Sequence, residues 1–204
     1  MLRNYRHRKG YTMSNRKRIY QSVQERIEQV SLEDAADFIF KDTLSNCRNE
    51  RYLNELIELE NSASENAAIV MIDVSAFKLI DLNYGVVFGQ KVLRKLGNFL
   101  LSYFKPTDEV IRYYGDVFVV VLYNTTPDAL LMRIGDVISE VEALEFSQHP
   151  EVALKIVAGG CLTNELNHEA LADADAMLHK AKTQDCKFIV EQLNSSWSKE
   201  FVIR

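Results

Sequence analysis

The sequence predicts an α/β protein with a palm-like, split β-α-β-β-α-β sheet, flanking helices and a helical N-terminal extension. Residues 67–72 are almost continuously apolar, which is typical of a central strand covered on both faces. A helical stripe of apolar residues follows between 92 and 104. Two strand-like runs, 110–113 and 117–122, then surround Tyr114-Gly115-Asp116, a pattern that indicates a hairpin in the middle of the sheet.

The segments before this core are predicted from charge and period. Residues 1–18 are polar and basic without periodicity, so we expect a disordered arm. Residues 19–37 form an N-terminal helical segment, whose amphipathic stretch Ile19–Val30 we expect to pair two chains. Ser31 followed by Asp34 resembles a capping box and predicts a second helix start there.

The second half of the chain continues the alternation of helices and strands. Pro127 opens a predicted helix that runs to Val141. Residues 152–162 are expected to form a strand with a bulge at Gly159-Gly160. A helix around 171–181 and a short strand at 188–190 complete a folded domain that we place at 38–193, followed by a tail at 194–204.

Composition and charge exclude several classes of protein. The first 20 residues hold seven basic residues and no acid, which leaves 17 basic against 29 acidic residues in 21–204, a net charge of −12. An acidic body makes nucleic acid an unlikely partner. The longest apolar run has seven residues, too short to span a membrane. Three widely spaced cysteines build neither a disulfide framework nor a zinc site, so we expect a cytoplasmic protein.

Two aspartates could share one end of the sheet. Asp73 closes the first apolar strand, and Asp116 stands at the predicted hairpin tip. If that strand and the hairpin are neighbours, two carboxylates meet, and such oxygen pairs bind Mg²⁺ together with phosphates. The residues alone leave a second interpretation open, in which Asp73 merely ends a strand and Asp116 merely serves a turn.

Several motifs together resemble one known family. The stretch from Arg112 to Phe118 resembles Arg-Tyr-Gly-Gly-Asp-Glu-Phe, the signature of the GGDEF domain of diguanylate cyclases. Residues 73–81 are similar to that family's D-x-D-x-F-K-x-I-N, and 174–182 to its A-D-x-A-L-Y-x-A-K. Residues 42–53 resemble its opening motif. The resemblance runs in register over 38–193.

The resemblance implies an activity and a set of site residues. The family condenses two GTP molecules into cyclic di-GMP in an antiparallel dimer, and it serves bacterial signalling. The resemblance assigns a Mg²⁺ site to Asp73, Val74 and Asp116, with Mg²⁺ expected only when nucleotide is bound. It also implies that one set of residues is what remains of the nucleotide-binding site. A second set is what remains of the inhibitory site, which has the pattern R-x-x-D in the family. These are Phe77, Lys78, Asp81, Gln90 and Lys182 for the nucleotide, and Lys105 and Asp108 for the inhibitor.

Two departures from the signature decide the expected function. Tyr114 replaces the first glycine, whose lack of a Cβ lets the backbone approach the nucleotide, and Val117 replaces the second acid. We therefore expect no functioning catalytic residue beyond the remnant Asp116. The predicted function is a catalytically impaired GGDEF domain that regulates or binds a partner, as a homodimer or with another protein. One alternative is a sensor that binds GTP or cyclic di-GMP without turnover, and a second is a slow diguanylate cyclase.

Overall fold

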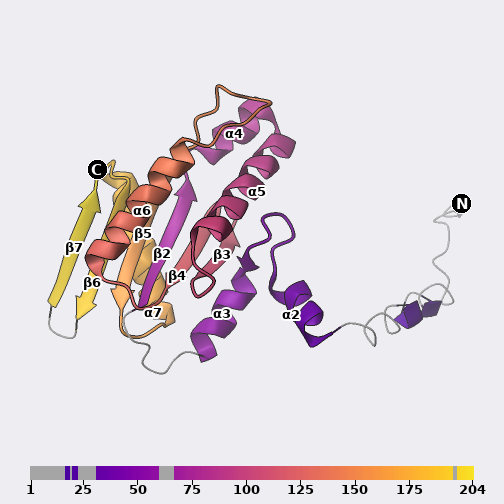
Figure 1. Cartoon of the computed structure of the whole chain (residues 1–204), viewed down its shortest axis with the longest axis horizontal. Helices are drawn as coiled ribbons and strands as arrows, with labels where there is room; N and C mark the ends of the chain where they lie inside the picture. Colours follow the sequence, from indigo (N-terminus) through magenta and orange to yellow (C-terminus); the bar gives the residue numbers. More distant parts are fainter. Residues whose placement is uncertain (1–16, 19, 23–30, 60–66, 195–196) are drawn as a thin grey trace, which may run out of the picture. The chain divides into compact units, whose positions relative to one another are not determined.

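The computed structural model of the chain describes residues 17–18, 20–22, 31–59, 67–194 and 197–204. The chain divides into two units, Met1–Ile39 and Phe40–Arg204. Figure 1 shows the chain coloured by sequence position from the N-terminus to the C-terminus. The expected arm at 1–18 and the expected pairing helix Ile19–Val30 lie largely outside the described residues, so both stay predictions.

The helix start predicted at Ser31 is confirmed. The amide of Asp34 donates to the Ser31 hydroxyl oxygen at 3.1 Å, and that hydroxyl donates to Asp34 Oδ2 at 2.8 Å. This reciprocal pair satisfies a backbone donor that the first helical turn would otherwise leave unpaired. Helix α2 (Leu32–Phe40) begins directly after it.

The larger unit is a mixed sheet of seven strands in the order β1-β3-β4-β2-β5-β6-β7. The pairs β2–β4, β2–β5, β3–β4 and β6–β7 are antiparallel, and β1–β3 and β5–β6 are parallel. The predicted split β-α-β-β-α-β core is therefore confirmed in β3, β4, β2 and β5, with β1 added at one edge of the sheet and β6 and β7 at the other. The strands are β1 (Arg48–Asn49), β2 (Ala67–Val74), β3 (Glu109–Tyr114), β4 (Val117–Leu122), β5 (Ile156–Thr163), β6 (Phe188–Asn194) and β7 (Trp197–Ile203).

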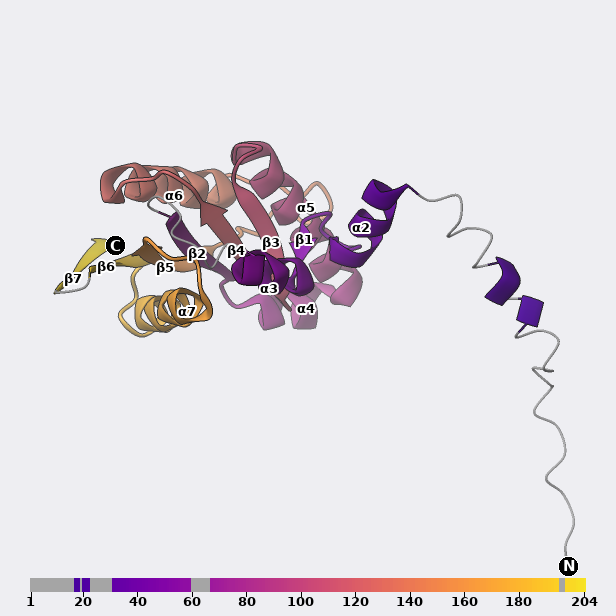
Figure 2. The ribbon, with the colours of Figure 1, turned by 90° about the horizontal axis from the view of Figure 1, so that it is seen from below.

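Helices cover both faces of the sheet (Figure 2). One core cluster joins α5 and α6 to alternate residues of β2 such as Val70 and Ile72, and the other joins α3 and α7 to Ile69 and Met71. This double cover explains why β2 is apolar at nearly every position. The helices are α3 (Glu50–Leu59), α4 (Phe77–Tyr84), α5 (Val86–Tyr103), α6 (Pro127–Glu142) and α7 (His168–Thr183).

The glycine pair in β5 was predicted to mark a bulge, and that prediction is wrong. The β2–β5 register runs without a shift from Ala67–Thr163 to Val74–Ile156. A Cβ on Gly159 would lie 1.8 Å from the backbone nitrogen of Leu178, so the glycine instead admits the close approach of α7 to the sheet. The irregularity lies in the hairpin, where the β3–β4 register shifts between Arg112 and Tyr114.

The C-terminal boundary also differs from the expectation. Residues 194–204, expected as a tail, include β7, which pairs with β6 and lengthens the sheet at that edge. Within the described ranges no helix is both long and apolar enough to cross a membrane.

Candidate functional site

The end of β2 and the β3–β4 hairpin bring the two predicted aspartates together. Asp73 is the next-to-last residue of β2, and its Cα is paired with Val117, the first residue of β4. Asp116 occupies the turn just before Val117, and its carbonyl accepts a hydrogen bond from the Val74 amide at 3.4 Å. The Val74 side chain is 1% exposed and belongs to the core on the α5 and α6 face, so only its backbone is available to the site.

The hairpin tip is held by an arginine. Gly115 has φ +52°, a left-handed conformation that favours glycine. The Arg112 guanidinium donates to the Gly115 carbonyl at 2.6 and 3.0 Å and to both carboxylate oxygens of Asp42 at 3.2 Å. Asp42 also accepts hydrogen bonds from the amide and hydroxyl of Ser45, both at 2.7 Å. Burial acts to raise the pKa of Asp42, but these bonds and the arginine charge outweigh it and lower that pKa.

The two aspartates and one lysine form a cluster of charges. Lys182 Nζ on α7 lies 2.7 Å from Asp73 Oδ2. The pKa of Asp116 is raised by burial and by the negative charge of Asp73, while the positive charges of Lys182 and Arg112 act against that rise. The carboxylates are thus close enough to repel each other, and a lysine supplies the compensating charge.

Tyr114 lies beside this cluster. Its side chain is 53% exposed, and its ring centroid is 5.1 Å from that of Tyr113. Burial raises the pKa of the Tyr114 phenol, and the negative charges of Asp175, Asp73 and Asp116 raise it further. Tyr114 therefore belongs to the same hairpin as Asp116, and the charges of Asp175, Asp73 and Asp116 act on its phenol.

Val117 is buried and has almost no contact with solvent. It is 2% exposed and stands directly across from Asp73 on the neighbouring strand. Side chains at such paired positions lie about 4.5–5.5 Å apart at their Cβ atoms. An acid at position 117 would face Asp73, whereas the valine places an apolar group there.

The other residues assigned to nucleotide binding differ in their exposure. Asp81 on α4 points at Gly89 on α5, where an added Cβ would lie 1.9 Å from Asp81 Oδ1. That oxygen is buried, and no described residue donates a hydrogen bond to it. Gln90 and Lys78 are exposed, and Phe77 is half-buried against the core.

The two residues assigned to the inhibitory site lie between α5 and β3. The Asp108 side chain is 3% exposed and accepts a hydrogen bond from Arg133 Nη2 on α6 at 2.6 Å. It also accepts the Lys105 amide at 3.0 Å, while the Lys105 side chain is exposed. Asp108 therefore connects α6 with the segment between α5 and β3 through its hydrogen bonds.

Sequence reasoning missed three of these partners. Nothing in the sequence pattern pairs Asp42 with Arg112, although both belong to motifs that were recognised. The contact of Lys182 with Asp73 was also missed, because Lys182 was assigned to nucleotide binding. Arg133 lies in no recognised motif, and only its proximity in space links it to Asp108.

Comparison with known proteins agrees with this geometry. Residues 39–187 match the family model described as "Diguanylate cyclase, GGDEF domain". The chain belongs to the GGDEF domain family. An uncharacterized membrane protein of Staphylococcus aureus is 27% identical to this GGDEF domain chain over 141 residues. That match covers 66% of this chain but only 40% of the relative, so the chain spans well under half the length of that relative.

Solved structures of GGDEF domains share the fold. The diguanylate cyclase SiaD of Pseudomonas aeruginosa, solved in complex with its activator SiaC, has a TM-score of 0.72 and 22% identity over 89% of this chain and 72% of its own. The GGDEF domain of DgcB from Caulobacter crescentus, solved in complex with c-di-GMP, has a TM-score of 0.66 and 20% identity over 75% of this chain and 95% of its own. These similarities show that the sheet and its helices have the fold of GGDEF domains.

Proposed function

We propose that this GGDEF domain makes no efficient cyclic di-GMP and acts as a regulatory or interaction module in bacterial cyclic di-GMP-related signalling. The observation that carries the proposal is the ion pair of Asp73 with Lys182 at 2.7 Å, together with the valine that stands opposite Asp73 on the neighbouring strand, Val117. Val117 replaces the second acid of the family signature, and of the two aspartates that remain, Asp73 is paired with Lys182.

The residues present fit Mg²⁺ only as a site of two carboxylates. Asp73 and Asp116 are the residues that would hold it, since Mg²⁺ is often bound by one or two carboxylates plus substrate phosphates. Among the described residues no group of three or more His, Cys, Asp or Glu side chains could hold a metal ion. Bound Mg²⁺ would neutralise phosphate charge, and Lys182 would have to release Asp73 first.

Tyr114 adds a steric argument. The family's glycine at this position lets the backbone approach the nucleotide, whereas the tyrosine ring is half-exposed beside Asp73 and Asp116. Correct alignment of the reacting groups supplies a large part of the rate in such reactions, so an obstructed approach is costly. Loss of an acid or base typically costs about 10²–10⁴-fold in rate.

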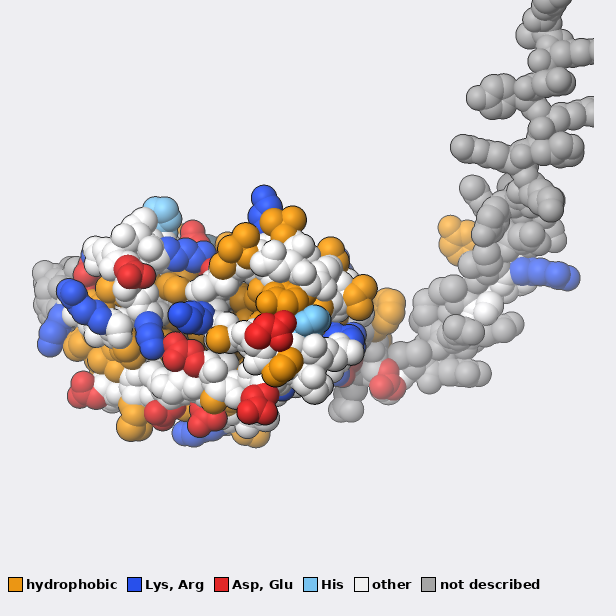
Figure 3. Space-filling model, turned by 90° about the horizontal axis from the view of Figure 1, so that it is seen from above, with side chains coloured by type: hydrophobic (Ala, Val, Ile, Leu, Met, Phe, Trp, Pro, Cys, Tyr) orange, Lys and Arg blue, Asp and Glu red, His pale blue; other side chains and the backbone are white. Residues whose placement is uncertain are grey.

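The interaction role is supported by an exposed apolar surface on α4 and the first turn of α5. The side chains are 56–70% exposed, and they are Leu79, Leu82, Val86 and Val87. Figure 3 looks onto the end of the larger unit where α4 lies and shows hydrophobic side chains grouped there. Grouped apolar side chains on a surface commonly mark an interaction site, here for a second copy or another protein.

A nucleotide sensor is the second candidate. It is favoured by the mutual repulsion of Asp73 and Asp116, because a site that retains closely spaced carboxylates retains an affinity for divalent cations. This candidate predicts saturable, Mg²⁺-dependent binding of GTP or cyclic di-GMP without turnover.

A turnover assay on the full chain tests the proposal. Purified protein, GTP and Mg²⁺ are incubated, and cyclic di-GMP is measured by mass spectrometry beside an active cyclase. We expect no product from the wild type or from Val117→Glu, since Tyr114 still obstructs the approach. Turnover by the wild type at a rate near that of the control would overturn the proposal, and calorimetric titration with GTP separates the sensor from a module that binds no nucleotide.

A further inference from the structure

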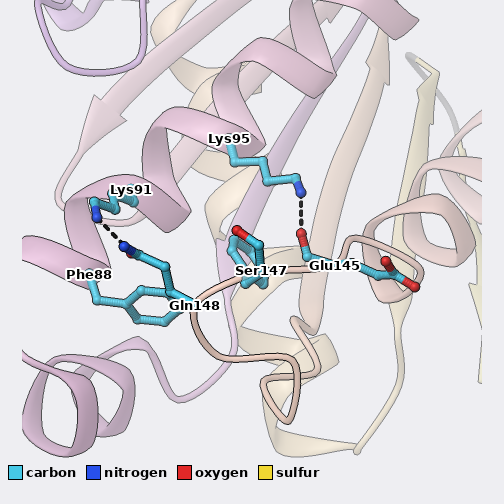
Figure 4. Close-up of a pocket in the computed structure, with 7 residues that line it drawn as sticks. Phe88, Lys91, Lys95, Glu145, Ser147 and Gln148 are labelled. Atoms are coloured by element: carbon cyan, nitrogen blue, oxygen red, sulfur yellow. Dashed lines mark hydrogen bonds between the residues drawn. The ribbon is translucent and has the colours of Figure 1, made fainter.

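A cavity lies away from the hairpin, between α5 and the segment that joins α6 to β5. It has a volume of about 550 Å³, within the range of ligand pockets. Figure 4 shows its labelled lining residues, which come from these two segments. They are Phe88, Lys91, Lys95, Glu145, Phe146, Ser147 and Gln148.

Both lysines of the cavity have only neutral partners. Lys91 Nζ donates to Gln148 Oε1 at 2.6 Å, and Lys95 Nζ donates to the backbone carbonyl of Glu145 and lies 5.0 Å from the Phe146 ring centroid. Within the part of the chain that the structure describes, neither ammonium is paired with a carboxylate. Figure 4 shows the Glu145 carboxylate pointing away from both lysines. The cavity therefore holds two positive charges inside an acidic body.

We propose that this cavity binds a small anion with two or more phosphoryl groups, held by Lys91 and Lys95. The two lysines are one helical turn apart, so their Cβ atoms are about 5–6 Å from each other. Their ammonium groups bond to different residues of the segment that joins α6 to β5, so an anion with two adjacent phosphoryl groups would present separate charged oxygens to each. The neutral oxygens now bonded to the lysines would be replaced by charged ones, which adds the attraction between opposite charges to each hydrogen bond.

The rest of the lining suits such a ligand. The exposed Ser147 hydroxyl and Gln148 amide add donors on the side of the cavity opposite α5. Phe88 and Phe146, packed edge to face with centroids 5.6 Å apart, give the cavity an apolar wall. A volume of about 550 Å³ exceeds what a bare diphosphate fills, so there is room for an attached organic group. The proposal concerns a different part of the domain from the site of Asp73 and stands independently of the proposed function.

Calorimetric titration of the full chain with inorganic tripolyphosphate at low ionic strength tests the proposal. We expect saturable binding that weakens as salt is raised. The double variant Lys91→Met/Lys95→Met is expected to bind about tenfold more weakly for each lysine lost. The control Lys187→Met/Lys199→Met removes the same charge elsewhere and is expected to bind like the wild type. Parallel titrations with ATP distinguish a nucleotide from free oligophosphate as the source of the phosphoryl groups.

Three results would overturn the proposal: no saturable binding by the wild type, unchanged binding by the methionine pair, or equal weakening by the control pair. Circular dichroism establishes that each variant is folded. If the methionine pair unfolds, Ser147→Ala/Gln148→Leu replaces it, because both residues are exposed. That variant is expected to bind several-fold more weakly, and Lys182→Met separates this cavity from any phosphate binding beside Asp73.

Discussion

Replacing Lys182 with methionine is expected to destabilise the domain by exposing the repulsion between Asp73 and Asp116. At the Nζ–Oδ2 distance of 2.7 Å, Coulomb's law gives about 1.5 kcal/mol in water and about 6 kcal/mol at an effective dielectric constant of 20. The Lys182 side chain is 42% exposed and that of Asp73 is 15% exposed, so solvent screening and desolvation remove most of this energy. We expect a loss of about 1–2 kcal/mol at pH 7.

The assay is thermal unfolding followed by circular dichroism. For a domain of this size the expected loss lowers Tm by roughly 2–8 °C. Because the pKa of Asp116 is raised, this carboxylate loses its charge as the pH falls toward about 4, and the difference between variant and wild type should shrink there. Millimolar Mg²⁺ without nucleotide should raise the Tm of the variant more than that of the wild type, because the lysine no longer competes for Asp73.

Lys180→Met is the matched control. Lys180 also lies on α7 and is paired with Glu200, but both of those side chains are about one-third exposed. Its loss should cost less than about 1 kcal/mol. The reasoning is refuted if Lys182→Met loses the same stability at pH 7 and pH 3, or if Lys180→Met is equally destabilised.

The remaining predictions concern stability and its dependence on pH. Asp42→Asn should cost about 2–3 kcal/mol at pH 7, because Arg112 loses its charged partner. Since the pKa of Asp42 is lowered by folding, this cost should fade in urea titrations as pH drops below about 4. Asp116→Asn should stabilise the domain at pH 7. The pKa of Asp116 is raised in the folded protein, so the stability of the wild type falls as the pH rises above about 4, and the variant lacks this loss. A variant whose Tm depends on pH in the same way as that of the wild type would contradict this. Gly159→Ala should cost about 3 kcal/mol or more in urea unfolding, because the new Cβ would lie 1.8 Å from the backbone of α7. Gly135→Ala, whose Cβ would meet its nearest neighbour at 3.5 Å, should be neutral or stabilising.

The pattern of apolar residues and the positions of proline and glycine were sufficient to predict most of the sheet. The continuous apolar run at 67–72 predicted a strand with two covered faces, and β2 has both. Pro127 and the hairpin around Gly115 marked element boundaries because their backbone preferences are local. The split core expected from the sequence predicted that the strand ending at Asp73 would lie beside the hairpin that carries Asp116, and β2 is paired with β4 in the structure.

Features that depend on contacts between distant segments could not be predicted in this way. The two glycines of β5 look in sequence like a bulge, and only the position of α7 shows that Gly159 is there to admit a helix. The edge strand β7 was missed because its residues alternate weakly and its stability comes from pairing with β6.

The candidate site also combines features that the sequence predicts with contacts that only the fold decides. Residue types and spacing determined which side chains belong to the hairpin, since a signature is read along the chain. Tertiary structure decided what each of them contacts: Lys182 pairs with Asp73, Arg112 joins the hairpin to Asp42, and Arg133 holds Asp108. Each of these pairs joins residues at least 25 positions apart, and the charge of a side chain does not specify its partner until the fold has placed both.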